Sequence, residues 1–162
     1  VAGENEMLMA ELTEAVDVDG ARDRLTEQMP RGIALGRSWL VSGKRLPQAR
    51  RVEYRLSVDP DDRFKVGEAI ARILSSPACH VERRHGSGKK PAVVDIRPPL
   101  AAMTLEGGEL RFAVGVTGEG GVRPGEVLEA LGLPPEQLAD LRRCDIVWRW
   151  PDEPDAMQHP ME

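Results

Sequence analysis

The chain has 162 residues, of which 41% are hydrophobic and 30% are charged, and its formal net charge is −5. This composition is that of a soluble globular protein and excludes a disordered or fibrous one; the length allows one domain or two very small ones. No window approaches the roughly 18 consecutive apolar residues of a membrane span, and acidic Glu4 and Glu6 stand where a signal peptide is basic. Two cysteines, Cys79 and Cys144, make no disulfide framework, so we expect a cytoplasmic protein.

The first part of the chain, residues 1–42, is predicted to form a partial α+β unit. Apolar and polar residues alternate over 7–16, which indicates a half-buried strand. Apolar residues then recur every four positions over 19–29, which indicates a helix. A second strand is expected over 33–41, and residues 43–49 are expected to link this unit to the next.

Residues 50–150 repeat the strand–helix–strand pattern and are predicted to form a second α+β unit. Strict alternation over 51–58 indicates a strand, and 3.6-residue periodicity indicates a helix over 62–75. Strands are expected near 78–84 and over 92–97. The residues that the helix is expected to bury are Phe64, Val66, Ile70, Ile73 and Leu74.

A glycine-containing segment at 85–88 lies between the last two of these strands and predicts a hairpin turn. Further on, alternation predicts a strand over 110–116, and a proline suited to the first turn of a helix precedes a helix over 124–131. A short helix is expected to start at the Pro134-Pro135 pair, and a last strand over 144–150.

Together these elements predict an α+β fold, because strand–helix–strand units recur without the long glycine-rich crossover of a nucleotide-binding sheet. We expect two consecutive ferredoxin-like strand-helix-strand units that form sheet-plus-helix sandwiches, the first of them incomplete. The tail, residues 151–162, has three prolines and no periodicity, and we expect it to be disordered.

Charge is strongly segregated along the chain. Residues 1–29 hold eight acidic and two basic residues, whereas residues 31–51, including Lys44 and Arg45, hold six basic residues and no acidic one. Such a basic segment can bind the phosphates of a nucleic acid, or it can pair with the acidic segment beside it. The better nucleic-acid candidate is the hairpin, since its turn is flanked by four basic residues, Arg83, Arg84, Lys89 and Lys90.

Two functional motifs are suggested by the sequence, but each lacks residues or spacing that it requires. The segment 86–90 resembles a phosphate-binding loop, but Arg83 and Lys90 stand where that loop needs a glycine and a Ser or Thr. Cys79, His80, His85 and Cys144 lack the ligand spacing of a structural zinc site. We therefore expect no bound metal and no cofactor.

Asp95 and Arg97 are the candidates for chemistry. They lie two residues apart on one expected strand, so both side chains emerge on the same face. They can form an ion pair, or they can offer a carboxylate and a forked donor to a ligand. Arg123 stands at the start of an expected helix, where it can join an anion site or remain a solvated loop residue.

Four segments, 94–98, 29–33, 49–56 and 123–128, resemble in order and spacing the radical SAM-linked domain of unknown function (domain of unknown function 2344). The similarity covers roughly residues 4–150. Members are fused to, or encoded beside, radical S-adenosylmethionine proteins, and some lie near RNase E/G-type ribonucleases. The resemblance implies a radical SAM protein as partner. It also implies that this chain, which begins with Val rather than Met, is the C-terminal part of the family domain.

Three functions follow as hypotheses. The first is a non-catalytic accessory module that presents RNA, or an RNA-linked substrate, to a radical SAM partner through the basic hairpin. Because the chain has only two cysteines, it cannot itself ligate a radical SAM cluster. The second is an RNA-modifying enzyme, similar to a pseudouridine synthase, that uses Asp95. The third is a purely structural protein-interaction domain.

Overall fold

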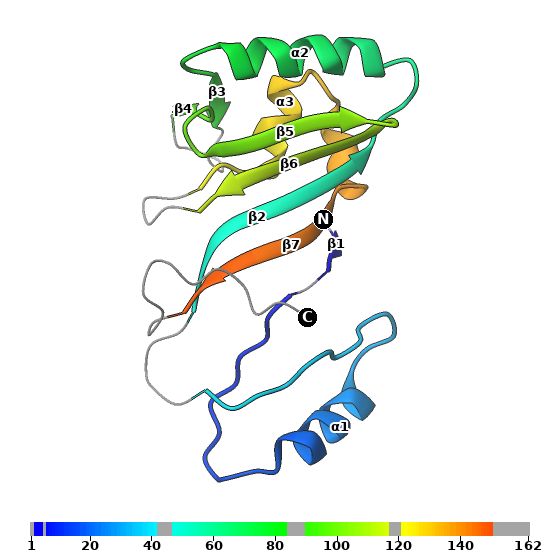
Figure 1. Ribbon diagram of the computed structural model, residues 1–162, viewed down its shortest axis with the longest axis vertical. Coiled ribbons are helices and arrows are strands. Elements are labelled where there is room, and N and C mark those ends of the chain that lie inside the picture. Colours follow the sequence, from blue (N-terminus) through cyan, green and yellow to red (C-terminus); the bar gives the residue numbers. More distant parts are fainter. Residues whose placement is uncertain (1, 5, 42–46, 84–89, 117–120, 151–162) are drawn as a thin grey trace. The chain divides into compact units, whose positions relative to one another are not determined.

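A computed structural model of the chain describes residues 2–4, 6–41, 47–83, 90–116 and 121–150. The chain divides into two compact units (Figure 1). The larger comprises Val1–Glu6 and Pro47–Glu162, and the smaller comprises Met7–Leu46.

The larger unit is built on a five-stranded sheet with the strand order β1-β7-β2-β6-β5. Its central strand, β2, pairs antiparallel with both β6 and β7; β5 and β6 form an antiparallel hairpin, and β1 runs parallel to β7. The strands are β1 (Ala2–Gly3), β2 (Gln48–Ser57), β5 (Leu100–Glu106), β6 (Glu109–Gly115) and β7 (Arg142–Arg149).

The connectivity of this unit is β2, α2, β5, β6, α3, β7, which is a β-α-β-β-α-β arrangement. A separate two-stranded sheet, β3 (His80–Arg83) with β4 (Ala92–Asp95), is inserted between α2 (Arg63–Ser75) and β5. The helix α3 (Pro124–Ala130) and a 3-10 helix, η1 (Pro135–Ala139), follow β6. The predicted α+β class is confirmed.

The core lies between the sheet and the two helices of this unit. Alternate residues of β2 and β6 face the helices, and the rings of Tyr54 and Phe112 stack there with centroids 5.1 Å apart. The helices contribute buried aliphatic side chains, including Val66, Ala69, Ile70, Ile73, Val127, Leu128 and Leu131. The other face of the sheet carries the intervening residues of each strand.

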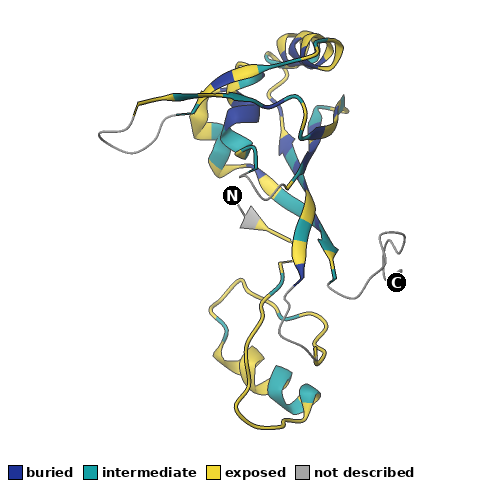
Figure 2. Cartoon of the chain, turned by 90° about the vertical axis from the view of Figure 1, so that its left-hand side faces the viewer, coloured by how far each residue is buried: buried dark blue, intermediate teal, exposed yellow. Residues whose placement is uncertain are grey.

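The smaller unit departs from the prediction. The expected helix is present as α1 (Val18–Gln28), with the Asp17 carboxylate accepting from Gly20 N at 2.9 Å. The strands expected over 7–16 and 33–41 are wrong, because the structure has no strand in either range. A strand needs a neighbour for its backbone and a buried face for its apolar residues. No described residue of 7–41 is buried (Figure 2). The alternation of apolar and polar residues was therefore not enough to form a strand in this unit.

In the larger unit the predicted helices over 62–75 and 124–131 are confirmed. The strand β5, which ends just before Gly107, was not predicted. Gly107 and Gly108, with φ of +59° and +87°, make the two-residue turn to β6. Phe64 and Leu74 were wrongly expected in the core, since they are 77% and 38% exposed.

Several expectations fall on residues that the structure does not describe. They are the hairpin turn at 85–88, most of the linker at 43–49, and the tail at 151–162. Within the described residues, no helix is long and apolar enough to cross a membrane.

Candidate binding site at the β3–β4 hairpin

The β3–β4 hairpin brings together most of the predicted site residues. His80 pairs with Asp95 at the open end of the hairpin, and Arg83 pairs with Ala92 toward the turn. Lys90 is exposed just before β4. The other predicted nucleic-acid contacts, Arg84, Lys89, Lys44 and Arg45, lie outside the described residues.

Asp95 binds the backbone of its own chain. One carboxylate oxygen, Oδ1, accepts from Cys79 N at 2.8 Å and from Arg97 N at 3.0 Å. The hydrogen bond from Cys79 N–H, followed by that from Arg97 N–H, lowers the pKa of Asp95 below its ordinary value. The carboxylate thus ties the end of β4 to the residue that precedes β3.

Arg97 turns its guanidinium away from this carboxylate. Nη1 donates to Leu100 O at 3.3 Å and Nη2 donates to Leu74 O at 3.2 Å, so the side chain links the start of β5 to the end of α2. The pairing expected between Asp95 and Arg97 therefore runs through the Arg97 backbone N–H. Both residues bind and orient neighbouring segments of the chain.

Arg83 forms a bidentate ion pair with Glu126 of α3. Nε lies 2.6 Å from Oε1 and Nη2 lies 2.8 Å from Oε2, and Nη2 also donates to Gly121 O at 3.0 Å. The two side chains are only 16% and 7% exposed. The parallel fork of hydrogen bonds makes this the strong form of an arginine–carboxylate pair. Arg83 therefore anchors β3 to α3 and does not face a phosphate in solution.

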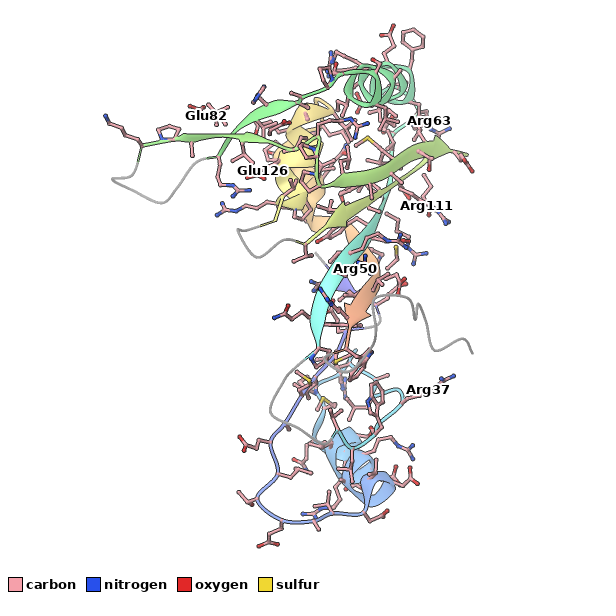
Figure 3. The ribbon with its side chains drawn as sticks, turned by 60° about the vertical axis from the view of Figure 1, so that its left-hand side comes forward. Arg37, Arg50, Arg63, Glu82, Arg111 and Glu126 are labelled. Atoms are coloured by element: carbon pink, nitrogen blue, oxygen red, sulfur yellow. The ribbon has the colours of Figure 1, made fainter. Side chains whose placement is uncertain are left out.

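Glu126 also occupies the N-terminus of α3. Its Oε2 accepts from Arg123 N at 2.9 Å. Burial alone would raise the pKa of Glu126, but the hydrogen bonds from Arg83 and Arg123 N–H outweigh it and hold the pKa below its ordinary value. The position predicted for an external anion beside Arg123 is filled by this carboxylate, while the Arg123 residue is exposed. Figure 3 shows Glu126 on the helical side of the sheet.

The acidic residues near the N-terminus also bind arginines, and within the described residues none of these arginines belongs to the basic segment 31–51. Glu4 pairs with Arg55 at 2.6 Å, and Glu6 pairs with Arg143. Both arginines belong to strands of the sheet. The acidic start of the chain is therefore neutralised in part by the sheet.

The two cysteines are partly buried thiols, and the Cys144 thiol donates to Glu53 O at 3.5 Å. Cys79 is half-buried against the core, and burial raises the pKa of its thiol and of the Cys144 thiol. Within the part of the chain that the structure describes, no group of three or more His, Cys, Asp and Glu residues could hold a metal ion.

Sequence reasoning missed Glu126. Its signal was present, because Pro124 occupies the first turn of the helix and an acidic residue follows at the third helical position. The residue before the proline is Arg123 rather than Ser or Thr, which concealed the capping role. Its second partner, Arg83, lies 43 residues away and could not be read from spacing.

These features define an α+β domain with an inserted hairpin. Polar side chains of both hairpin strands, Arg83 of β3 and Asp95 of β4, bind neighbouring segments of the chain. A family described as "Uncharacterized protein conserved in bacteria (DUF2344)" matches residues 1–124, and the chain belongs to it. The matched range includes Arg83, Asp95, Arg97 and Arg123, and it ends before Glu126. No curated protein and no solved structure matches the chain.

Proposed function

We propose that this protein is a non-catalytic accessory module that presents RNA, or an RNA-linked substrate, to a radical SAM protein. The larger unit is, in this proposal, a ferredoxin-like domain, since its elements follow the β-α-β-β-α-β order. The radical SAM partner is supported by the resemblance of the four segments described above.

The observation that carries the non-catalytic part is the engagement of Asp95. An RNA-modifying enzyme similar to a pseudouridine synthase would direct this carboxylate at a base in an open cleft. Oδ1 instead holds two backbone N–H groups, and Asp95 lines neither of the two depressions described on this unit. The proposal therefore assigns Asp95 to the architecture of the hairpin.

The hairpin is suited to binding because both of its strands are anchored. Arg83 joins β3 to α3, and Asp95 joins β4 to the segment before β3. An anchored arm loses little conformational freedom when it binds, which favours affinity. Since Arg83 is engaged, the proposal assigns the phosphate contacts to Lys90, which is exposed, and to Arg84 and Lys89, the other basic residues that flank the turn in the sequence.

The experiment is the affinity for a short single-stranded RNA, measured by fluorescence anisotropy across a salt series. The variant replaces Arg84, Lys89 and Lys90 with Ser. The control replaces three exposed arginines outside both basic segments, Arg24, Arg111 and Arg149, with Ser and so removes the same charge. Each lost contact should flatten the slope of log K against log salt by about 0.7, or about 2 for the variant.

The wild type and the control should share one slope, and the hairpin variant should bind more weakly with a flatter one. Equal affinities and slopes in all three proteins would contradict the RNA part of the proposal. The partner part is tested separately by size-exclusion chromatography of this chain with the radical SAM protein encoded beside it. Separate elution of the two would contradict it.

A further inference from the structure

Three arginines lie side by side across the sheet. In the register of the strands, Arg55 of β2 is directly opposite Arg111 of β6 on one side and Arg142 of β7 on the other. Thr104 of β5 extends the line beyond Arg111. We call Arg111, Arg55 and Arg142 the arginine row.

The arginine row lies on the face of the sheet that the helices do not cover. Directly paired residues of antiparallel strands lie on the same face, and side chains alternate along a strand. Tyr54 and Leu56, on either side of Arg55, are buried in the core, so Arg55 and its partners lie on the opposite face. Figure 3 shows Arg111 on the side of the sheet away from Glu126.

Like charges directly opposite one another destabilise a sheet. Negatively charged groups must therefore lie close to the arginine row to offset the repulsion between its members. Arg111 has Glu109, with Nε 2.6 Å from Oε1, and Arg55 has Glu4 at the same distance. For Arg142 no ion pair is seen among the described residues. Within the described residues, Arg142 is therefore the arginine of the row that no carboxylate holds in an ion pair.

A depression lies at the Arg142 end of the row. It has a volume of about 200 Å³ and is lined by Arg55, Leu56, Ser57, Glu109, Asp140 and Arg142. Pockets for whole drug-sized ligands measure about 300–1,000 Å³, so this one suits a small molecule or one end of a larger one. Two guanidinium groups beside a hydroxyl are the donors that recognise carboxylate and phosphate oxygens.

We propose that this depression binds a small ligand through one oxyanion, a carboxylate or a phosphate, held by Arg55 and Arg142. The Glu4 carboxylate on Arg55 is an internal anion that the ligand displaces. Glu109 and Asp140 line the same depression, which favours a ligand that also carries amino or hydroxyl donors and disfavours a polyanion such as RNA. The site is distinct from the hairpin and does not depend on the proposed function.

The test uses inorganic phosphate and acetate as the two probes, titrated by calorimetry into the full chain at constant ionic strength. Arg142→Gln removes the guanidinium that no described carboxylate holds in an ion pair, and Arg50→Gln, at an exposed arginine of β2 outside the row, is the matched control. Loss of a charged hydrogen-bond partner should weaken binding about tenfold in Arg142→Gln and leave Arg50→Gln unchanged. Glu4→Gln should tighten binding, because it removes the internal competitor.

Saturable binding of either probe with this order of affinities supports the site, and the tighter probe identifies the class of oxyanion. No saturable binding of either probe would overturn it. Equal weakening in Arg142→Gln and Arg50→Gln would also overturn it, since general attraction to a basic surface would then explain the binding. An unchanged affinity in Glu4→Gln would contradict the displacement. Circular dichroism confirms that each variant is folded.

Discussion

Asp95 and Glu126 are carboxylates that bind groups of their own chain. Asp95 accepts the N–H groups of Cys79 and Arg97. Glu126 accepts the Arg123 N–H and both arms of the Arg83 fork. Removing one member of a buried pair leaves the other charge uncompensated, which costs more than the pair itself contributes.

Glu126→Ala should therefore lower the free energy of unfolding by about 3 kcal/mol. Glu129→Ala, an exposed position on the same helix, is the control and should change it by less than about 0.5 kcal/mol. Urea denaturation of both variants measures the difference. A small and equal loss in both would show that the Arg83–Glu126 pair does not anchor the hairpin.

The lowered pKa values of Asp95 and Glu126 also predict the pH dependence of stability. A carboxyl group whose pKa is lower in the folded state stabilises the fold above its unfolded value, about 3.9 for Asp and 4.3 for Glu. This stabilisation is lost as the pH falls through the folded value. The free energy of unfolding should thus decrease below about pH 5, and less steeply in Glu126→Gln. Identical slopes for wild type and variant, from urea titrations at several pH values, would contradict this.

Helix α2 organises the loops around it through its basic residues. Lys65 Nζ donates to Gly132 O at 3.1 Å, and Arg72 Nη2 donates to Ala130 O at 3.4 Å. Both carbonyls lie at the C-terminal end of α3, where cations are favourable. The adjacent face of α2 buries Val66, Ile70 and Ile73 in the core, so the helix connects the core with the edge of the α3 turn.

Ile73 and Phe64 of α2 offer a matched contrast. Ile73→Ala should lower the free energy of unfolding by about 3 kcal/mol, because the side chain is fully buried and leaves a cavity. Phe64→Ala should change it by less than about 0.5 kcal/mol despite the larger side chain, because Phe64 is exposed. Thermal or urea denaturation measures both. A larger loss for Phe64→Ala would contradict the orientation of α2.

The elements that could be predicted from sequence are those whose periodicity reports a buried face. The alternation of β2 and the 3.6-residue spacing of α2 are such cases, and both lie on the core. Residues 7–16 alternate as well, but no described part of that segment is buried, so the pattern reported nothing about pairing. The candidate site shows the same limit, because only features visible within a short stretch of sequence could be predicted. Asp95 stood out locally, whereas the Arg83–Glu126 pair depends on a tertiary contact.

The arginine row was invisible for a related reason. Arg55, Arg111 and Arg142 are far apart in sequence, and only the register of β2 with β6 and β7 places them in one line. Register is set by long-range strand pairing, and a slip of one residue would move each side chain to the other face. No local pattern in the sequence contains that information.

At the scale of the whole molecule, the two units differ in how they are stabilised. The larger one has a buried core, whereas α1 of the smaller one has no buried residue. An isolated helix of 11 residues is marginal in water. In hydrogen exchange of the full chain, amides of α1 should exchange nearly as fast as an unfolded peptide, and those of β2 and β6 should be strongly protected. Comparable protection of α1 and β2 would contradict this difference.

The central claim is that the Asp95 carboxylate is a structural group, which holds the end of β4 to the segment before β3 through backbone hydrogen bonds. The most direct measurement is hydrogen exchange by NMR of the Cys79 and Arg97 amides in wild type and in Asp95→Ala. Both amides donate to the Asp95 carboxylate, so both should lose protection in the variant, while amides in the middle of β2 keep theirs. Unchanged protection of Cys79 and Arg97 would show that the carboxylate does not hold them, and the claim would fail.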